Sequence, residues 1–270
     1  MKQVIRIFSI ALIAQLVLIL NPQSVWAQKE RTDQEPSPAG TYSKAMGDTA
    51  YEKGEFAQAI TQYEGVLKYQ GVSADVYYNL GNAYYKSEKL GMAILNYEKA
   101  LKLTPADEDI KANLAMSNAK IVDKIEDVPQ IFLKNWADDV IYSMNLSTWG
   151  ILGVVFFVLA IASFCLYFWS REYNIRRVSF LLTFVFIVVA VVANLSAAHQ
   201  KHYLLLQNHA IVLRPTVTVY SAPGTGSNEQ FVLHEGSKVE IKDGSMSSWK
   251  EIQLLDGKVG WIEADAIGIY

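Results

Sequence analysis

The sequence predicts a multidomain chain with an all-α helical repeat, a two-helix transmembrane hairpin and a C-terminal all-β barrel, in that order. Three observations support this prediction. A pattern with a period of 34 residues fills the region 40–126, two long uncharged apolar runs lie in the middle of the chain, and short β-rich stretches separated by turns follow them. With 270 residues the chain has room for two small domains besides anchoring segments.

The composition fits soluble parts diluted by a few strongly apolar segments. Hydrophobic residues make up 51 % of the chain and charged residues 19 %, which is below the usual quarter. The net charge of -3 gives no electrostatic reason to expect nucleic acid as a partner. Cys165 is the only cysteine, so the chain cannot form an internal disulfide, a CxxC pair or a cysteine zinc site.

The N-terminus has the three-part layout of a secretory signal peptide. Basic residues precede an apolar run over 7–20, and residues of the cleavage-site type end at Ala27. The run is about 14 residues long, which is short for a hydrocarbon core of ~30 Å. We therefore expect a signal peptide over 1–27, with an uncleaved anchor as the alternative, and then a polar linker over 28–39.

The 34-residue period pairs similar residues in two consecutive copies. Gly47 aligns with Gly81, and Tyr63 aligns with Tyr97. Further pairs at the same spacing are Tyr51 and Tyr85, Ala59 and Ala93, Ile60 and Ile94, Glu64 and Glu98, and Leu67 and Leu101. Glycine and alanine at these places allow two helices to approach closely, while tyrosine and leucine side chains fill the remaining space. A third copy begins at Asn113 and stops after one helix.

These residues resemble the tetratricopeptide-repeat (TPR) family over 40–126. The resemblance implies an array of helix pairs that binds a peptide or protein along the concave face of the first helices. By helical spacing, this face would carry six candidate partner-binding residues: Lys44, Asp48, Tyr51, Tyr78, Asn82 and Tyr85. The alternative is that they are solvated polar residues or pack between helices, because tyrosine is common both at interfaces and in repeat cores.

Two apolar runs without a charged residue lie over 149–169 and 178–198. A helix of about 21 residues rising ~1.5 Å per residue spans roughly 30 Å, the thickness of a bilayer core. A buried hairpin of a soluble protein is the alternative, but no other segment is large enough to cover it. An amphipathic helix expected over 129–146 leads into the first span and would lie in the membrane interface.

The loop between the two apolar runs sets the expected orientation. Residues 170–177 contain Arg171, Arg176 and Arg177, which the positive-inside rule places in the cytoplasm. The two spans would then lie in the inner membrane, and both large domains and both termini would lie in the periplasm. The signal peptide independently demands the same side for the N-terminal domain.

The last region, 209–270, alternates short β-rich stretches with turn residues. Its segments Leu-His-Glu-Gly at 233–236, Trp-Lys-Glu-Ile at 249–252 and Asp-Gly-Lys-Val-Gly-Trp-Ile at 256–262 resemble the bacterial SH3 (SH3b) family. The resemblance implies an SH3-like barrel of five or six strands that binds a peptide or the cell wall. Trp261 is expected inside the barrel. Tyr220 and Trp249 form a second candidate surface, because SH3-like domains dock extended chains on aromatic side chains.

The sequence contains no catalytic constellation. HExxH, P-loop, GxSxG and dinucleotide-binding fingerprints are absent. The sole cysteine lies in an expected span, where it cannot attack a soluble peptide. His199 and His202 share a helix face, but no third metal ligand stands near them in the sequence. We therefore expect no enzyme, no cofactor and no metal.

The order of the parts resembles the BatE family, the E proteins of the Bacteroides aerotolerance (Bat) operon. The resemblance covers nearly the whole mature chain and implies a periplasm-facing inner-membrane protein of Bacteroidota. It implies partners among Bat membrane proteins with von Willebrand factor A domains and a MoxR-type ATPase system, in oxygen or oxidative-stress tolerance. The alternative is a cell-envelope anchor whose SH3b domain binds peptidoglycan. Signal transduction is disfavoured, because the short cytoplasmic loop offers almost nothing to recognise.

Overall fold

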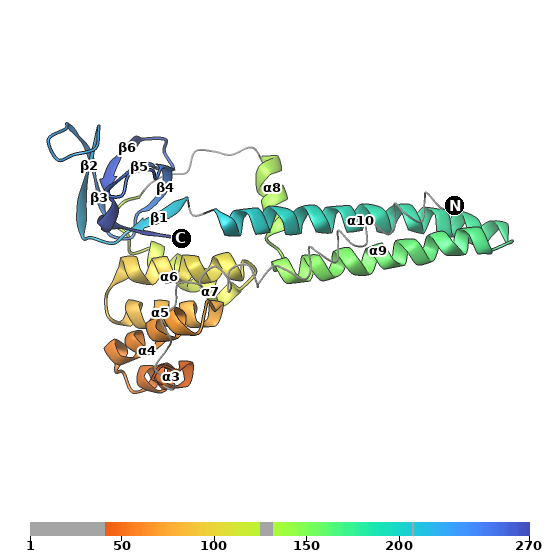
Figure 1. Ribbon diagram of the computed structural model, residues 1–270, viewed down its shortest axis with the longest axis horizontal. Coiled ribbons are helices and arrows are strands. Elements are labelled where there is room, and N and C mark those ends of the chain that lie inside the picture. The colour runs from red at the N-terminus through yellow and green to blue at the C-terminus, as the bar shows by residue number, and fades with distance from the viewer. Residues whose placement is uncertain (1–40, 125–131, 207) are drawn as a thin grey trace. The chain divides into compact units, whose positions relative to one another are not determined.

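The computed structural model describes residues 41–124, 132–206 and 208–270, and these fall into two compact units. Within the described part, one unit is built from residues 136–205, and the other combines the helical repeat with the C-terminal strands (Figure 1). The expected signal peptide and linker lie outside the described residues, and so do residues 125–131. The three predicted parts are all present, which confirms the predicted fold class.

The repeat consists of five helices: α3 (Lys44–Glu52), α4 (Phe56–Tyr69), α5 (Ala74–Lys86), α6 (Leu90–Leu103) and α7 (Glu108–Asn118). As the period predicts, α3 packs on α4 and α5 on α6, and α7 packs on α6 as the first helix of a third unit. Short polar side chains begin two of these helices. The Ser43 hydroxyl accepts a hydrogen bond from the backbone N–H of Met46 at 3.1 Å, and Asp107 caps α7 in the same way.

The close packing within each helix pair depends on glycine. A Cβ atom added to Gly47 would stand 2.4 Å from the ring of Tyr63, and one added to Gly81 would stand 2.6 Å from the ring of Tyr97. Both tyrosines are only 1 % exposed. The aligned glycines and tyrosines therefore make the same contact twice, one repeat apart, and the predicted close helix packing is confirmed.

The C-terminal region, the β domain, forms one antiparallel sheet of seven strands in the order β3-β2-β6-β5-β4-β1-β7. The strands are β1 (His209–Val212), β2 (Thr216–Tyr220), β3 (Glu229–His234), β4 (Lys238–Asp243), β5 (Trp249–Gln253), β6 (Val259–Glu263) and β7 (Ile267–Ile269), with a 3-10 turn at Ala264–Ala266. Every strand contributes to one buried cluster, including Leu233 of β3 and Ile267 of β7 at the two ends of the order. The sheet must therefore curve around a single core.

Trp261 does not pack inside this core, and that prediction is wrong. Along β6, Gly260 and Ile262 are buried, whereas Trp261 between them is only half-buried. Side chains alternate between the two faces of a strand, so Trp261 lies on the outer face. Trp261 is a large aromatic residue, but the register of the strand and not the size of the side chain decides which face it occupies.

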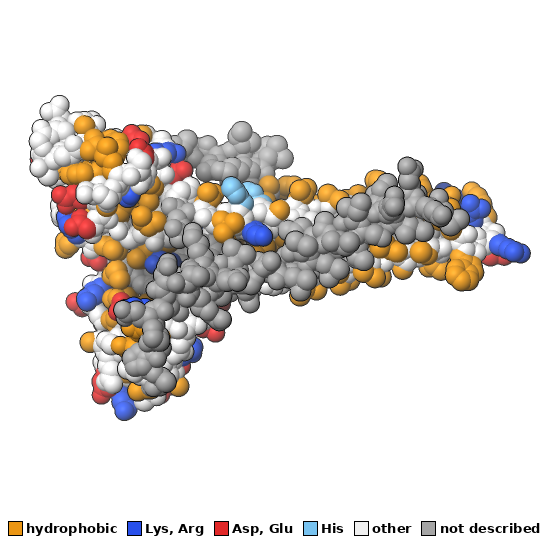
Figure 2. All heavy atoms as spheres, viewed as in Figure 1, with side chains coloured by type: hydrophobic (Ala, Val, Ile, Leu, Met, Phe, Trp, Pro, Cys, Tyr) orange, Lys and Arg blue, Asp and Glu red, His pale blue; other side chains and the backbone are white. Residues whose placement is uncertain are grey.

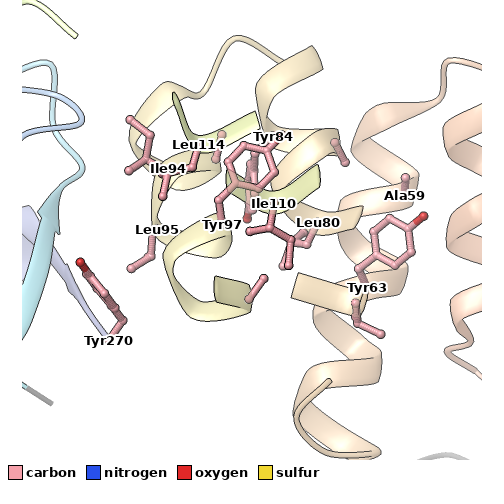
Figure 3. Packing of buried hydrophobic residues seen from close by; sticks show 14 of the residues in the cluster. Ala59, Tyr63, Leu80, Tyr84, Ile94, Leu95, Tyr97, Ile110, Leu114 and Tyr270 are labelled. Carbon is pink, nitrogen blue, oxygen red and sulfur yellow. The ribbon is translucent and has the colours of Figure 1, made fainter. Parts of the chain in front are cut away.

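The β domain packs on α6, so that repeat and sheet share one hydrophobic core. Ile211 and Tyr270 of the β domain belong to the same buried cluster as Leu95 of α6, and Figure 3 shows Tyr270 near Leu95. Eight of the 14 residues of α6 are buried, against four of the 14 in α4. At the position of the buried Leu95, α4 has the exposed Thr61. The difference between the two copies thus follows the contact with the sheet.

Polar contacts border this interdomain interface. The backbone N–H of Gly91 donates to Glu235 Oε1 at 2.7 Å, near the start of α6. The ammonium of Lys238 lies 3.0 Å from Oε1 of Glu98, which is 8 % exposed. Glu235 comes from the segment 233–236, which resembled the SH3b family in sequence. This segment therefore has a structural role in docking the β domain on the repeat.

A carboxylate after α7 joins the same interface. Asp123 accepts hydrogen bonds from the backbone N–H of His234 at 2.7 Å and from the hydroxyl of Ser237 at 2.5 Å. The ring of His234 lies beside it, with Nδ1 2.7 Å from Oδ1. Burial opposes the charged form of Asp123, but the hydrogen bonds from Ser237 and His234 outweigh it, so the pKa of Asp123 is below its ordinary value.

The second unit is a hairpin of two long helices, α9 (Leu146–Trp169) and α10 (Tyr173–Leu205). Each contains an 18-residue window with a mean hydropathy of 2.7, of which only 17 % and 22 % are buried. A core helix of a soluble protein would be mostly buried, so these two helices have the length, composition and exposure of a membrane-spanning hairpin. Hydrophobic side chains line much of the visible surface of the hairpin in Figure 2.

Small residues lie where the two helices touch. Ala160 is 1 % exposed and Ala193 0 %, and a Cβ added to Gly153 would stand 2.8 Å from Nδ2 of Asn194. The helices are separated only by residues 170–172, so Arg176 and Arg177 are the fourth and fifth residues of α10 rather than part of a loop. Small residues at such contacts let two apolar helices pack closely in lipid.

The predicted amphipathic helix corresponds to α8 (Phe132–Ile141) in the part that the structure describes. The hairpin holds the end of this helix. The indole N–H of Trp149 donates to the carbonyl of Ile141 at 2.9 Å, and the side-chain amide of Gln200 donates to the same carbonyl and, at 2.7 Å, to that of Met144.

Candidate protein-binding site

A pocket of about 240 Å³ opens between the first helices of the first two repeats. It is lined by Asp48, Tyr51, Glu52, Tyr63, Asn79 and Asn82. Three of the predicted partner-binding residues, Asp48, Tyr51 and Asn82, are thus brought together in one concave site. The β domain packs on α6, a second helix, and leaves this pocket open.

Asp48 is the centre of the pocket. Its Oδ1 accepts hydrogen bonds from the Tyr63 hydroxyl at 2.7 Å and from Nδ2 of Asn79 at 3.0 Å. Its Oδ2 lies 2.9 Å from the ammonium of Lys44, another predicted residue. Burial favours the neutral acid, but hydrogen bonds from Lys44 and Tyr63 outweigh it and lower the pKa of Asp48. The pocket therefore holds a fixed negative charge at neutral pH.

The same network recurs one repeat later without the charge. Oδ1 of Asn82 accepts from the Tyr97 hydroxyl at 2.7 Å and from Nδ2 of Asn113 at 2.9 Å. The amide of Asn113 also donates to the hydroxyl of Tyr78 at 2.9 Å. Asn82 thus takes the structural place of Asp48, which shows that the charge of Asp48 is not needed to build the network.

The predicted tyrosines extend the site along the groove. Burial and the neighbouring Tyr78 raise the pKa of Tyr51, so its hydroxyl stays protonated at neutral pH. Tyr78 lies with its ring centroid 6.0 Å from that of Tyr97. Tyr85 lies outside the pocket, with the ammonium of Lys120 4.3 Å from its ring centroid. These groups provide aromatic surface and hydroxyls for an extended partner.

Sequence reasoning missed Glu52, Tyr63 and Asn79 as lining residues. Tyr63 was assigned to the core, and its ring is indeed buried while its hydroxyl reaches the pocket. Glu52 follows Asp48 by one helical turn, and Asn79 precedes Asn82 by a similar step, so both share a helix face with a predicted residue. Helical spacing was therefore a signal that could have found Glu52 and Asn79.

The second candidate surface lies on the outer face of the β domain. Tyr220 and Trp249 meet edge to face with ring centroids 5.7 Å apart. Trp261 stands directly opposite Tyr220 in the pairing of β2 with β6 and thus adds a third aromatic residue to the same face. Sequence reasoning missed it there because it was assigned to the core.

The remaining predicted residues lie apart from these two surfaces. Arg171, Arg176 and Arg177 are exposed at the end of the hairpin where α9 and α10 are joined. Among the described residues, no group of three or more His, Cys, Asp and Glu side chains could hold a metal ion.

Comparison with known families identifies the repeat. Family models described as TPR repeat and tetratricopeptide repeat match residues 47–88 and 74–107. A comparison with curated proteins finds no match to the chain. The chain therefore contains TPR repeats, a class of repeat that serves protein–protein interaction. In addition it has two helices that are consistent with a membrane-spanning hairpin, and an antiparallel β domain.

Proposed function

We propose that the chain is a non-enzymatic, membrane-anchored scaffold that binds another protein in the concave groove of its TPR domain. The observation that carries this proposal is the open pocket around Asp48, from which the polar network and the tyrosines continue along the first helices. TPR grooves bind protein segments, and a groove left open by the neighbouring domain is available to a partner.

We propose the inner membrane as its location, with both folded parts in the periplasm. The arginines at the joined end of α9 and α10 support a cytoplasmic position for that end. The interdomain interface supports a common side for the TPR repeats and the β domain, since a two-span hairpin connects them and they share one core.

The partner class that we propose follows from the order of the parts. The sequence resembles the BatE family, so the scaffold would assemble with other membrane proteins of the Bat type, such as those with von Willebrand factor A domains, and with a MoxR-linked system. Its role would lie in aerotolerance and oxidative stress, and the β domain would be of the SH3b class. The TPR groove is the part of the chain that would make this contact.

A photo-cross-linking residue tests the proposal in native membranes. With the cross-linker in place of Tyr85, we expect an adduct with another protein, and we expect Tyr51→Ala combined with Tyr78→Ala to remove it. The control carries the cross-linker in place of Thr61, which is exposed on α4 outside the pocket. Equal adducts from both positions, or an adduct that survives the double substitution, would exclude the groove as the binding site.

A second candidate function is peptidoglycan binding by the β domain, favoured by the aromatic cluster of Tyr220, Trp249 and Trp261. Planar aromatic side chains on an open sheet face offer a flat surface to sugar rings or to an extended peptide. Co-sedimentation of the detergent-solubilised chain with purified sacculi tests it. Binding that is lost in Trp249→Ala would support this function, and no sedimentation of the unmodified chain would remove it.

A further inference from the structure

We propose that the pocket at Asp48 and Glu52 receives a cationic side chain, an arginine or a lysine, from an extended segment of the protein partner. The inference rests on the proposed function of the TPR groove and specifies what the groove selects. Charge, hydrogen-bonding capacity and the comparison between repeats each support it.

The charges around the pocket leave it negative. Asp48 is paired with Lys44, whose ammonium lies 2.9 Å from Oδ2. Glu52 is exposed, and none of the described residues forms an ion pair with it. One cation therefore faces two carboxylates, and the local charge is -1. A cationic partner group would compensate this charge, whereas a carboxylate would be repelled by it.

The hydrogen bonds of the pocket point to the same class of ligand. The Tyr63 hydroxyl and an amide N–H of Asn79 already donate to Asp48, so these donors are used inside the protein. The carboxylates of Asp48 and Glu52 bring acceptor positions and no donor when ionised. Guanidinium and ammonium groups bring only donors, so they match a pocket whose charged groups accept hydrogen bonds.

The acidic character is confined to the first repeat. One period later, Asn82 stands in the place of Asp48, and Lys86 stands in the place of Glu52. A further period places Lys120 at the same position, and all three residues of this series, Glu52, Lys86 and Lys120, are exposed. The sign of the charge therefore changes along the groove, which would fix the direction of a bound segment with its basic residue at the first repeat.

A matched peptide series tests the inference on the full chain in detergent micelles. The probe is a library of capped, extended hexapeptides in which one position carries arginine, citrulline or glutamate. Citrulline has nearly the same shape as arginine but no charge. We expect arginine peptides to bind about three- to tenfold more tightly than their citrulline twins, as for a partly exposed charge pair, and glutamate peptides to bind most weakly.

Substitutions assign this preference to the pocket. Glu52→Gln and Asp48→Asn should each reduce the arginine-to-citrulline ratio, and Asp48→Asn is structurally safe because Asn82 makes the same network. Glu55→Gln is the control, since Glu55 is exposed near the pocket but does not line it. It should leave the ratio unchanged.

The outcomes separate this inference from the proposed function. Equal affinity of arginine and citrulline peptides, absence of binding of both, or a ratio that survives both pocket substitutions would overturn the cation site. If the cross-linker at Tyr85 still gives its adduct in that case, the groove binds a partner by other chemistry. If the cross-linker at Tyr85 also gives no adduct, the proposal that the groove binds a partner is overturned as well.

Discussion

Glu88 has a left-handed backbone conformation, and the equivalent residue of the first repeat, Gly54, has the same conformation without a Cβ atom. The φ angle is +61° at Glu88 and +78° at Gly54, which stands one period earlier. Both turns make the same hydrogen bond, from Gly54 N–H to Tyr51 O at 2.9 Å and from Glu88 N–H to Tyr85 O at 3.2 Å. The two positions are thus a matched pair that differ in having a Cβ atom.

Glu88→Gly should therefore stabilise the repeat by about 0.5–1 kcal/mol. The left-handed conformation costs ~1 kcal/mol or more for a residue with a Cβ atom, and glycine removes this cost. Part of the stabilisation is lost because glycine gives the unfolded chain more conformational freedom. Gly54→Ala should cost a similar amount. Chemical denaturation of the two variants measures both effects. A lower stability of Glu88→Gly would show that its side chain contributes more than the backbone loses.

Gly91→Ala tests a second glycine, at the interdomain interface. A Cβ atom there would stand 2.7 Å from the carbonyl oxygen of Val212, a backbone atom that cannot rotate away. Helix propensity alone would favour alanine by about 1 kcal/mol, whereas overpacking costs about 1–3 kcal/mol. We expect a net loss of protection from hydrogen exchange in α6 and β1. The control is Ala57→Gly, the reverse change at the exposed equivalent position, which should affect only α4.

At the scale of elements, the contact between the end of the TPR repeats and the β domain should weaken in acid. The pKa of Asp123 is below its ordinary 3.8, so its stabilisation is complete above that value and is lost as the pH falls through the lower folded pKa. Burial and the nearby Lys238 lower the pKa of His209 below 6.5, so the unfolded state takes up that proton first and stability also falls below pH 6.5.

Hydrogen exchange of β1 and α6 between pH 7 and pH 3 measures this acid sensitivity. Asp123→Asn should weaken the interface at pH 7 and flatten its dependence on pH below 4, because the titrating carboxyl is gone. Ser247→Ala, at an exposed loop position outside the interface, is the control. An unchanged pH profile in Asp123→Asn would mean that other groups cause the acid loss.

The hairpin allows a comparable test of its packing. Ala193 is fully buried between α9 and α10, whereas Val192 beside it is 45 % exposed. Ala193→Leu should separate the two helices, since overpacking a filled contact costs about 1–3 kcal/mol, while Val192→Leu should have little effect. Thermal unfolding in detergent, followed by helix content, compares the two. Equal midpoints would contradict the close contact between the helices.

The sequence predicted the elements that depend on local pattern, and it missed what depends on contacts between distant segments. The period of 34 residues located the glycine and tyrosine contacts because each repeat packs within itself. The docking of the β domain on α6 was not foreseen, although Leu95 in place of Thr61 and Gly91 in place of Ala57 mark the interface. A difference between two repeat copies indicates that one surface makes a contact that the other does not, but it does not tell which segment covers that surface.

The candidate sites show the same limit. Asp48, Tyr51 and Asn82 were found because helical spacing defines one face, and the structure places them in one pocket. Trp261 was misplaced because its aromatic character does not tell which face of a short strand it occupies, and a difference of one residue in register moves a side chain to the opposite face.

At the scale of the whole molecule, chain connectivity and the interdomain interface together restrict the topology. Residues before the hairpin and residues after it share one hydrophobic core, with Ile211 and Leu95 as members. If the hairpin crosses the membrane twice, both folded parts must lie on the same side. Which side this is depends on a separate observation, the three arginines at the joined end of the helices.

Cysteine labelling distinguishes these two statements. In a Cys165→Ala background the chain has no other cysteine. A membrane-impermeant maleimide should label Ala57→Cys in the repeat and Ser247→Cys in the β domain of intact spheroplasts, because both positions are exposed. Glu172→Cys, between the helices, should be labelled only after permeabilisation. If positions 57 and 247 differ in labelling, the shared core does not form in the membrane. If both are protected while position 172 reacts, the core stands but the chain has the opposite orientation, and a periplasmic partner is excluded.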